Sequence, residues 1–230
     1  MKDLYRIQNI FFDFDGTIMD TSEGIKNGFS YALKKFGKEL PQGDFYRRLI
    51  GPPLSESFEH ILGFKKEEVS LCIDLYREYY APKGLYEVSV YKGIPELLEK
   101  LKKSGKKVCI ASSKPKTFVE ELLRKFSLDK YFDFISASDM NEKNASKALI
   151  IKKAMDFCRQ SQDIETDDFL MIGDRKYDMI GATENSIRAA GALWGFGSLQ
   201  ELKDAGASIC FENAEAVAKQ IVTDTYSAIC

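Results

Sequence analysis

Two aspartates at the end of an apolar run carry the first chemical signal in the sequence. In FFDFDGTIMD, residues 11–20, Asp13 and Asp15 follow the hydrophobic residues of a predicted strand, and Gly16 and Thr17 come directly behind them. Residues two apart in an extended chain point to the same side. We therefore expect both carboxylates to face one site.

Other polar residues follow later apolar stretches in the same way. Ser112, Ser113 and Lys114 end the stretch at 106–113, and Asp174 ends the stretch at 168–174, with Asp178 four residues further on. Ligands of an open parallel sheet bind beyond the carboxyl ends of its strands. If these stretches are parallel strands, their polar residues should meet at one edge of the sheet.

A lysine is expected to join this edge from the helix that precedes the 168–174 stretch. Lys143 and Lys147 both lie near the start of that helix, and the spacing to the helix favours Lys147. Because the dipole at a helix N-terminus disfavours a cation, a lysine at this position points to a function.

These residue types fit metal-assisted chemistry at phosphorus. Three carboxylates repel one another unless a cation neutralises them, and Mg²⁺ prefers oxygen ligands while accepting waters and a substrate phosphate. A metal alone would not need the hydroxyl of Ser112 and the ammonium of Lys147. Both groups suit the charge that spreads over a phosphoryl group during transfer.

The elements that must position these residues alternate between strands and helices. Short apolar stretches predict strands at 10–12, 106–113, 131–139, 168–174, 188–197 and 207–213. Amphipathic segments predict helices at 95–103, 117–126, 147–158 and roughly 178–186. This alternation is typical of an α/β fold with a doubly wound parallel sheet, a Rossmann-like core. The last residues, 223–230, are expected to be a frayed tail.

Residues 19–89 break this alternation. They contain helical patterns at 24–36, 44–50, 54–62 and 66–80, separated by glycine and proline, and no convincing strand. We therefore predict a small helical cap at 19–89, inserted after the first strand of a catalytic core formed by 1–18 and 90–230. Cap closure would use hinges near 17–21 and 84–92. Arg47 and Arg48 are as consistent with solvated surface residues as with substrate contacts.

The composition excludes several classes of function. A net charge of −2 gives no signature of binding to a nucleic acid polymer, and no apolar stretch approaches the ~20 residues of a membrane span. His60 is the single histidine, which excludes zinc sites built on several imidazoles and leaves acid–base chemistry to carboxylates and lysines. Five cysteines without a CxxC pair, and no secretory signal pattern, fit a cytoplasmic protein with reduced thiols.

Four of the stretches resemble, in order, the motifs of the haloacid dehalogenase-like hydrolase superfamily. They are DFDGT at 13–17, SSK at 112–114, Lys147 in SKALII, and GDRKYD at 173–178. The helical insertion resembles the smaller cap of that superfamily's first structural subgroup. IGPPLSESF and GALWGFGS look like the branch that contains phosphoglycolate phosphatases and 5′-nucleotidases.

The resemblance implies a Mg²⁺-dependent phosphatase that works through a phosphoaspartyl intermediate. Asp13 would be the nucleophile, Asp15 the general acid and base, and Lys147 the group that neutralises the phosphoryl charge. The metal would be held by Asp13, Asp174 and the backbone carbonyl of Asp15, while Asp178 would orient a metal-bound water or Lys147. The residues expected to contact the phosphate are Ser112, Ser113, Thr17 and Gly16.

The resemblance also implies a class of substrates and leaves some alternative functions open. Small phosphorylated metabolites are implied, 5′-nucleotides first and phosphoglycolate second, with a monomer or weak homodimer and no membrane or nucleic acid partner. A phosphosugar mutase and a catalytically silent binding protein stay open. Asp15 and Asp174 argue against a dehalogenase, which needs neither a leaving-group acid nor a metal. A signalling receiver module carries its phosphorylated aspartate on a later, central strand. The candidate here, Asp13, follows the first strand, which argues against such a module. Trp194 and Phe196 are interpreted as packing residues.

Overall fold

The computed structural model describes residues 3–140, 146–160 and 163–222. Lys143 and the expected tail at 223–230 lie outside these ranges. The chain forms two compact units, one made of Met1–Ile18 with Val90–Cys230 and the other of Met19–Ser89.

The larger unit is built on a six-stranded sheet in the order β5-β4-β1-β6-β7-β8, in which neighbouring strands are parallel. The strands are β1 (Asn9–Phe12), β4 (Lys107–Pro115), β5 (Phe134–Ser138), β6 (Phe169–Gly173), β7 (Arg188–Ala192) and β8 (Ile209–Phe211). This sheet confirms the predicted doubly wound α/β fold. Strand β7 ends at Ala192, so the prediction of a strand continuing to 197 was wrong.

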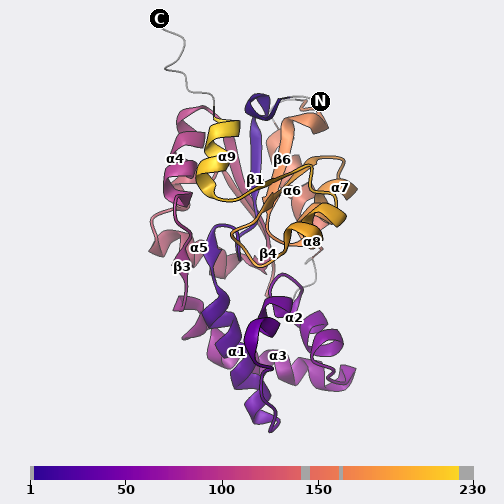
Figure 1. Ribbon diagram of the computed structural model, residues 1–230. Coiled ribbons are helices and arrows are strands. Elements are labelled where there is room, and N and C mark those ends of the chain that lie inside the picture. Colours follow the sequence, from indigo (N-terminus) through magenta and orange to yellow (C-terminus); the bar gives the residue numbers. More distant parts are fainter. Residues whose placement is uncertain (1–2, 141–145, 161–162, 223–230) are drawn as a thin grey trace, which may run out of the picture. The chain divides into compact units, whose positions relative to one another are not determined.

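Helices cover both faces of this sheet (Figure 1). One face carries α4 (Ile94–Lys103), α5 (Lys116–Lys125) and α9 (Ala214–Ile221), and the other carries α6 (Lys147–Arg159), α7 (Lys176–Glu184) and α8 (Leu199–Asp204). Because both faces are covered, the central strands are apolar throughout: all four residues of β1 are buried. The sequence analysis predicted four of these helices and missed α8 and α9.

The order of the strands creates a switch point beside β1. From β1 the chain continues to β4 and β5 on one side, and it returns through α6 to β6, β7 and β8 on the other. Phe12 of β1 pairs in register with Ile110 of β4 and Ile172 of β6. The residues that follow these three therefore emerge together at the carboxyl edge, where ligands of such sheets bind.

The smaller unit is mainly helical. It contains α1 (Ser22–Lys35), the 3₁₀-helix η2 (Gly43–Leu49), α2 (Leu54–Glu56), the π-helix η3 (Ser57–Ile61), α3 (Lys66–Tyr80) and the 3₁₀-helix η4 (Gly84–Tyr86). Its core is aromatic: the ring of Phe29 on α1 lies 5.0 Å from that of Phe58 and 4.9 Å from that of Tyr76. His60 is exposed on η3, as expected for a residue without a catalytic role.

Two short strands mark the ends of the smaller unit. β2 (Met19–Asp20) and β3 (Ser89–Val90) form a separate two-stranded sheet. The expectation of no strand between 19 and 89 was therefore wrong. Strands of two residues leave too little of a pattern for alternation to reveal them.

Two further properties of the described residues bear on the sequence predictions. None of the helices within 3–140, 146–160 and 163–222 is long and apolar enough to cross a membrane. The cysteines in these ranges are free of disulfides, and Cys72, Cys109 and Cys158 are buried.

Candidate active site

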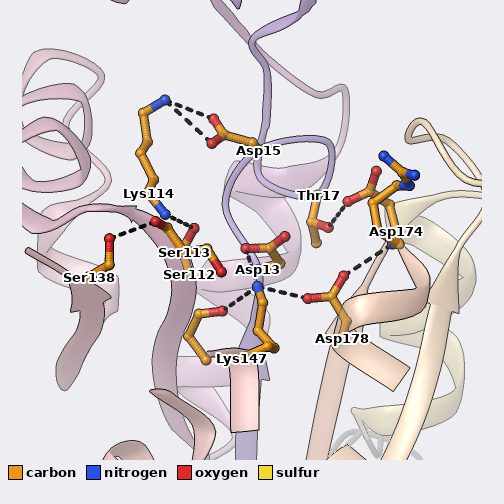
Figure 2. Close-up of polar contacts among 12 residues, drawn as sticks. Asp13, Asp15, Thr17, Ser112, Ser113, Lys114, Ser138, Lys147, Asp174 and Asp178 are labelled. Atoms are coloured by element: carbon orange, nitrogen blue, oxygen red, sulfur yellow. Dashed lines mark hydrogen bonds and ion pairs between the residues drawn. The ribbon is translucent and has the colours of Figure 1, made fainter. Parts of the chain in front are cut away.

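A buried lysine joins two aspartates at the centre of the carboxyl edge (Figure 2). Nζ of Lys147, the first residue of α6, lies 2.8 Å from Oδ1 of Asp13 and 2.8 Å from Oδ1 of Asp178. It also donates a hydrogen bond of 3.1 Å to the carbonyl oxygen of Ala111 in β4. Three neighbouring strands and the helix between them therefore converge on this ammonium group.

Asp13 directly follows β1 and is only 6% exposed. Its backbone N–H donates to the carbonyl oxygen of Ile172 at 2.9 Å, which extends the pairing of β1 with β6 by one residue. The carboxylate is thus fixed by the sheet itself and is not carried on a loop. This is the rigid placement that a nucleophile needs.

Asp174 lies on the next strand end and is held by two other segments of the chain. Its Oδ1 accepts from the hydroxyl of Thr17 at 3.1 Å, and its Oδ2 accepts from the backbone N–H of Phe196 at 2.8 Å. The indole N–H of Trp194 donates to the carbonyl oxygen of Thr17 at 3.0 Å. The loop after β7 therefore folds back over Asp174.

Two glycines make this close approach possible. Gly16 has a φ of +83°, and a Cβ there would overlap the carboxylate of Asp174. A Cβ at Gly195 would overlap Asp174 and the carbonyl oxygen of Gly16. Only glycine fits either position without moving the carboxylate.

Asp178 is fully buried at the first turn of α7. Its Oδ2 accepts a hydrogen bond of 3.0 Å from the backbone N–H of Arg175, while its Oδ1 faces Lys147. The same loop is anchored further out, because Arg175 Nε donates to Oε1 of Glu201 at 2.9 Å. Asp178 thus caps its helix and orients the lysine at the same time.

The charges of this cluster shift the protonation equilibria of its members. Burial, together with the charges of Asp178 and Asp13, raises the pKa of Asp174 well above its ordinary value. Burial and the charge of Asp13 raise the pKa of Asp178 to about 6, although Lys147 opposes the shift. Burial alone would lower the pKa of Lys147, but Asp13 and Asp178 outweigh it and raise that pKa. One lysine therefore does not balance the three carboxylates.

The donor set fits a small divalent cation. Asp13, Asp174 and Asp178 each offer a carboxylate oxygen within 4.8 Å of the others. Among the described residues, Oδ1 of Asp13 and Oδ1 of Asp178 are buried without accepting an aligned hydrogen bond, although both lie near Lys147. Hard carboxylate oxygens that repel one another are the ligands that Mg²⁺ prefers.

The hydroxyl groups predicted to contact phosphate end β4. Ser112 is buried, and its Oγ accepts a hydrogen bond of 3.3 Å from the backbone N–H of Lys114. The carbonyl oxygen of Ser113 accepts from the hydroxyl of Ser138, on neighbouring β5, at 2.7 Å. The strand end is thus tied to β5 on the side away from Asp174.

Asp15 points away from the acidic cluster. Its Oδ1 and Oδ2 lie 3.0 and 3.4 Å from Nζ of Lys114 (Figure 2). Both aspartates follow β1, as expected, but their carboxylates do not face the same group. Asp13 contacts Lys147, whereas Asp15 contacts Lys114.

The structure brings most of the predicted residues to one edge and adds others. Thr17 and Gly16, expected at the phosphate, contact Asp174. Trp194 and Phe196, interpreted as packing residues, secure the segments around Asp174. The contact of Lys114 with Asp15 was not predicted from the sequence. The glycines on both sides of Phe196 were the available signal for the folded-back loop, because glycine marks close backbone approach.

Comparison with known proteins places this geometry in a family. The family model for haloacid dehalogenase-like hydrolases matches residues 10–192. A 5′-nucleotidase from Pseudomonas aeruginosa is 37% identical over 198 residues, which cover 86% of this chain and 88% of that protein. The solved structure of a predicted phosphatase from Clostridium acetobutylicum is 40% identical, with a TM-score of 0.85, and the match covers 92% of this chain and 96% of that one.

A relative with a different printed activity also matches. Tyrosine-protein kinase PtkA from Mycobacterium tuberculosis is 31% identical over 191 residues, which cover 83% of this chain and 63% of that protein. The match therefore leaves more than a third of the kinase without a counterpart here. The family model matches most of this chain, and so does the similarity to the 5′-nucleotidase. This chain therefore belongs to the haloacid dehalogenase-like hydrolases.

Proposed function

We propose that this protein is a Mg²⁺-dependent phosphatase that hydrolyses small phosphate monoesters through a phosphoaspartyl intermediate. The observation that carries the proposal is the Asp13 carboxylate, fixed by β1 and β6, which faces the buried Lys147 beside two further buried carboxylates. A nucleophile with an adjacent cation at the edge of a parallel sheet suits phosphoryl transfer.

The metal would be held by Asp13, Asp174 and the backbone carbonyl of Asp15. A bound Mg²⁺ would supply charge stabilisation to the phosphoryl oxygens. Asp178 keeps Lys147 oriented, and Thr17 and the 194–197 loop keep Asp174 in place.

In the first step, an oxygen of Asp13 forms a bond to phosphorus while the bond between phosphorus and the leaving oxygen breaks. Asp15 donates its proton to that oxygen. In the second step, Asp15 accepts a proton from water as the water oxygen bonds to phosphorus and the bond to Asp13 breaks. Ser112 and Lys147 bind phosphoryl oxygens throughout, and the products are an alcohol and inorganic phosphate.

We propose 5′-nucleotides as the first substrate class, supported by the 37% identity to a 5′-nucleotidase. Phosphoglycolate is the second candidate, on the sequence resemblance alone. A phosphosugar mutase would use the same groups but would return the phosphoryl group to a sugar hydroxyl. The proposal includes a cytoplasmic enzyme, monomeric or weakly dimeric, without a membrane or nucleic acid polymer as partner.

We also propose that Met19–Ser89 acts as a cap over the catalytic unit, with hinges near 17–21 and 84–92. Equal domain spacing in solution scattering, with and without Mg²⁺ and a phosphate analogue, would contradict closure. The assignment of 19–89 as a cap is supported by the sequence resemblance.

The test is phosphate release from a panel of nucleoside 5′-phosphates, phosphoglycolate and sugar phosphates. Release should require Mg²⁺, stop with chelator and vanish in Asp13→Asn. Asp156→Asn is the matched control, since Asp156 lies on the exposed face of α6. Its Oδ2 forms an ion pair with Nζ of Lys152 at 2.8 Å. No release of phosphate from any ester would refute the phosphatase and favour the mutase or a silent binding protein.

A further inference from the structure

Lys114 is a buried cation outside the acidic cluster. Its side chain is 4% exposed, and its Nζ lies 3.0 Å from Oδ1 and 3.4 Å from Oδ2 of Asp15, whose side chain is 18% exposed. Asp13 and Asp15 are thus two residues apart, yet each carboxylate faces its own lysine (Figure 2).

The end of β4 is shaped to aim this lysine. The pairing of β4 with β5 changes register between Ser112 and Pro115, an irregularity that redirects side chains near active sites. Ser138 secures the carbonyl of Ser113, and Pro115 immediately precedes α5. The backbone of Lys114 is therefore fixed on both sides.

The same residue connects two groups of the proposed mechanism. Its backbone N–H donates to the hydroxyl of Ser112, while its side chain bonds Asp15. A change in the conformation of residue 114 would therefore disturb a phosphate-binding hydroxyl and the acid–base group together.

Stability does not explain this arrangement. Removing an ammonium and a carboxylate from water carries a large free-energy cost, so a buried ion pair is often no more stabilising than apolar residues of the same size. A methionine would fill the volume of the lysine stem. A role in fixing the direction of Asp15 accounts for the charge.

We propose that Lys114 is a positioning residue for the acid–base step, an inference that rests on the proposed function. It anchors Oδ1 of Asp15 and leaves the more loosely held Oδ2 to exchange a proton with the leaving oxygen and then with water. It also keeps this carboxylate turned away from Asp13, so that the nucleophile and the acid contact different sides of the ester.

The test compares Lys114→Met and Lys114→Arg with the wild type on the best ester of the panel. General acid–base groups contribute roughly 10²–10⁴-fold, so we expect Lys114→Met to lower kcat about 10–100-fold. KM should change less than about threefold, because substrate binding is a separate interaction. Lys114→Arg keeps the charge and should recover most of kcat.

Lys116→Met is the matched control. Lys116 lies two residues further on, is half exposed and pairs with Glu120 at 3.7 Å, so its removal should leave kcat and KM within about twofold. Chemical unfolding of each variant shows whether a loss of rate reflects a loss of fold.

A kinetic double-mutant cycle with Asp15→Asn assigns the effect. If Lys114 acts through Asp15, Lys114→Met should lower phosphate release less than about twofold in the Asp15→Asn background. A full loss in that background, or a rise in KM at constant kcat, would overturn the inference and make Lys114 a substrate contact. A wild type without activity on any ester would instead refute the proposed function, and this inference with it.

Discussion

Replacing Asp178 by asparagine should stabilise the metal-free protein at neutral pH. Asparagine keeps the shape and can still accept the hydrogen bond from the backbone N–H of Arg175, but it removes a negative charge from a fully buried cluster. In the wild type, burial and Asp13 raise the pKa of Asp178 from 3.8 to about 6.

The sign follows from linkage. An acid whose pKa is higher in the folded state binds its proton more tightly there, so its stabilising contribution is complete below pH 4 and is lost as pH rises through 6. A shift from 3.8 to about 6, at 1.36 kcal/mol per pH unit, corresponds to a loss on the order of 3 kcal/mol. Asp174, whose pKa is raised too, acts in the same direction.

The assay is urea unfolding in the presence of chelator between pH 4 and pH 7.5. Asp178→Asn and wild type should be similar near pH 4, and the variant should become more stable by up to ~3 kcal/mol near pH 7. Adding Mg²⁺ should narrow this gap, because the cation offsets the charge repulsion that asparagine removes, and a ligand at 100 times its Kd stabilises a protein by about 2.7 kcal/mol.

Asp156→Asn serves again as the control on the exposed face of α6, and its difference from wild type should stay within ~0.5 kcal/mol at every pH. A gap between Asp178→Asn and wild type that does not change with pH would refute the electrostatic account of the cluster. So would a variant that is less stable than wild type at pH 7 without metal.

Three further changes test the surroundings of the cluster. Gly195→Ala should weaken Mg²⁺ binding and destabilise the fold by about 1–3 kcal/mol, because the added Cβ would overlap Asp174. The melting temperature, measured at increasing Mg²⁺ concentrations, reports the stability and the affinity. If neither changes, the close approach of residue 195 to Asp174 is contradicted. Lys147→Met should lower the free energy of unfolding by about 3–5 kcal/mol, because Asp13 and Asp178 lose their cation. The control Lys152→Met, at an exposed position, should lower it little. Equal urea unfolding curves for the two variants would contradict this expectation. Trp194→Phe should cost about 1 kcal/mol through the lost bond to Thr17, visible in urea unfolding, and no loss would show that bond to be unimportant.

The sequence was sufficient to predict the sheet and the residues at its carboxyl edge. Strands covered on both faces must be apolar, so β1 and β6 stand out as short hydrophobic runs, and their register places Asp13 and Asp174 on neighbouring strand ends. The position of Lys147 followed from the start of its helix. These features depend on local patterns and on the general rules of parallel sheets.

Contacts between distant segments could not be predicted in this way. The loop at 194–197 can return to Asp174 because its glycines leave room for that carboxylate. The apolar residues before and after Gly195 are equally consistent with a continuing strand, although β7 ends at Ala192. The direction of Asp15 toward Lys114 depends on an irregularity of β4 that has no periodic signature. Helix α8 had a local signal in the spacing of Ser198 and Glu201, which is typical of a helix start, and the hydroxyl of Ser198 accepts from the backbone N–H of Glu201.

The most direct test of the proposed mechanism is chemical trapping of the phosphoenzyme. Wild type is mixed with Mg²⁺ and its best ester, quenched in the steady state, and treated with borohydride, which reduces an acyl phosphate to an alcohol. The mechanism predicts that mass spectrometry finds homoserine in place of Asp13 alone in the wild type, and no homoserine at residue 13 in Asp13→Asn. Modification at another residue, or none while phosphate is being released, would contradict nucleophilic attack by Asp13.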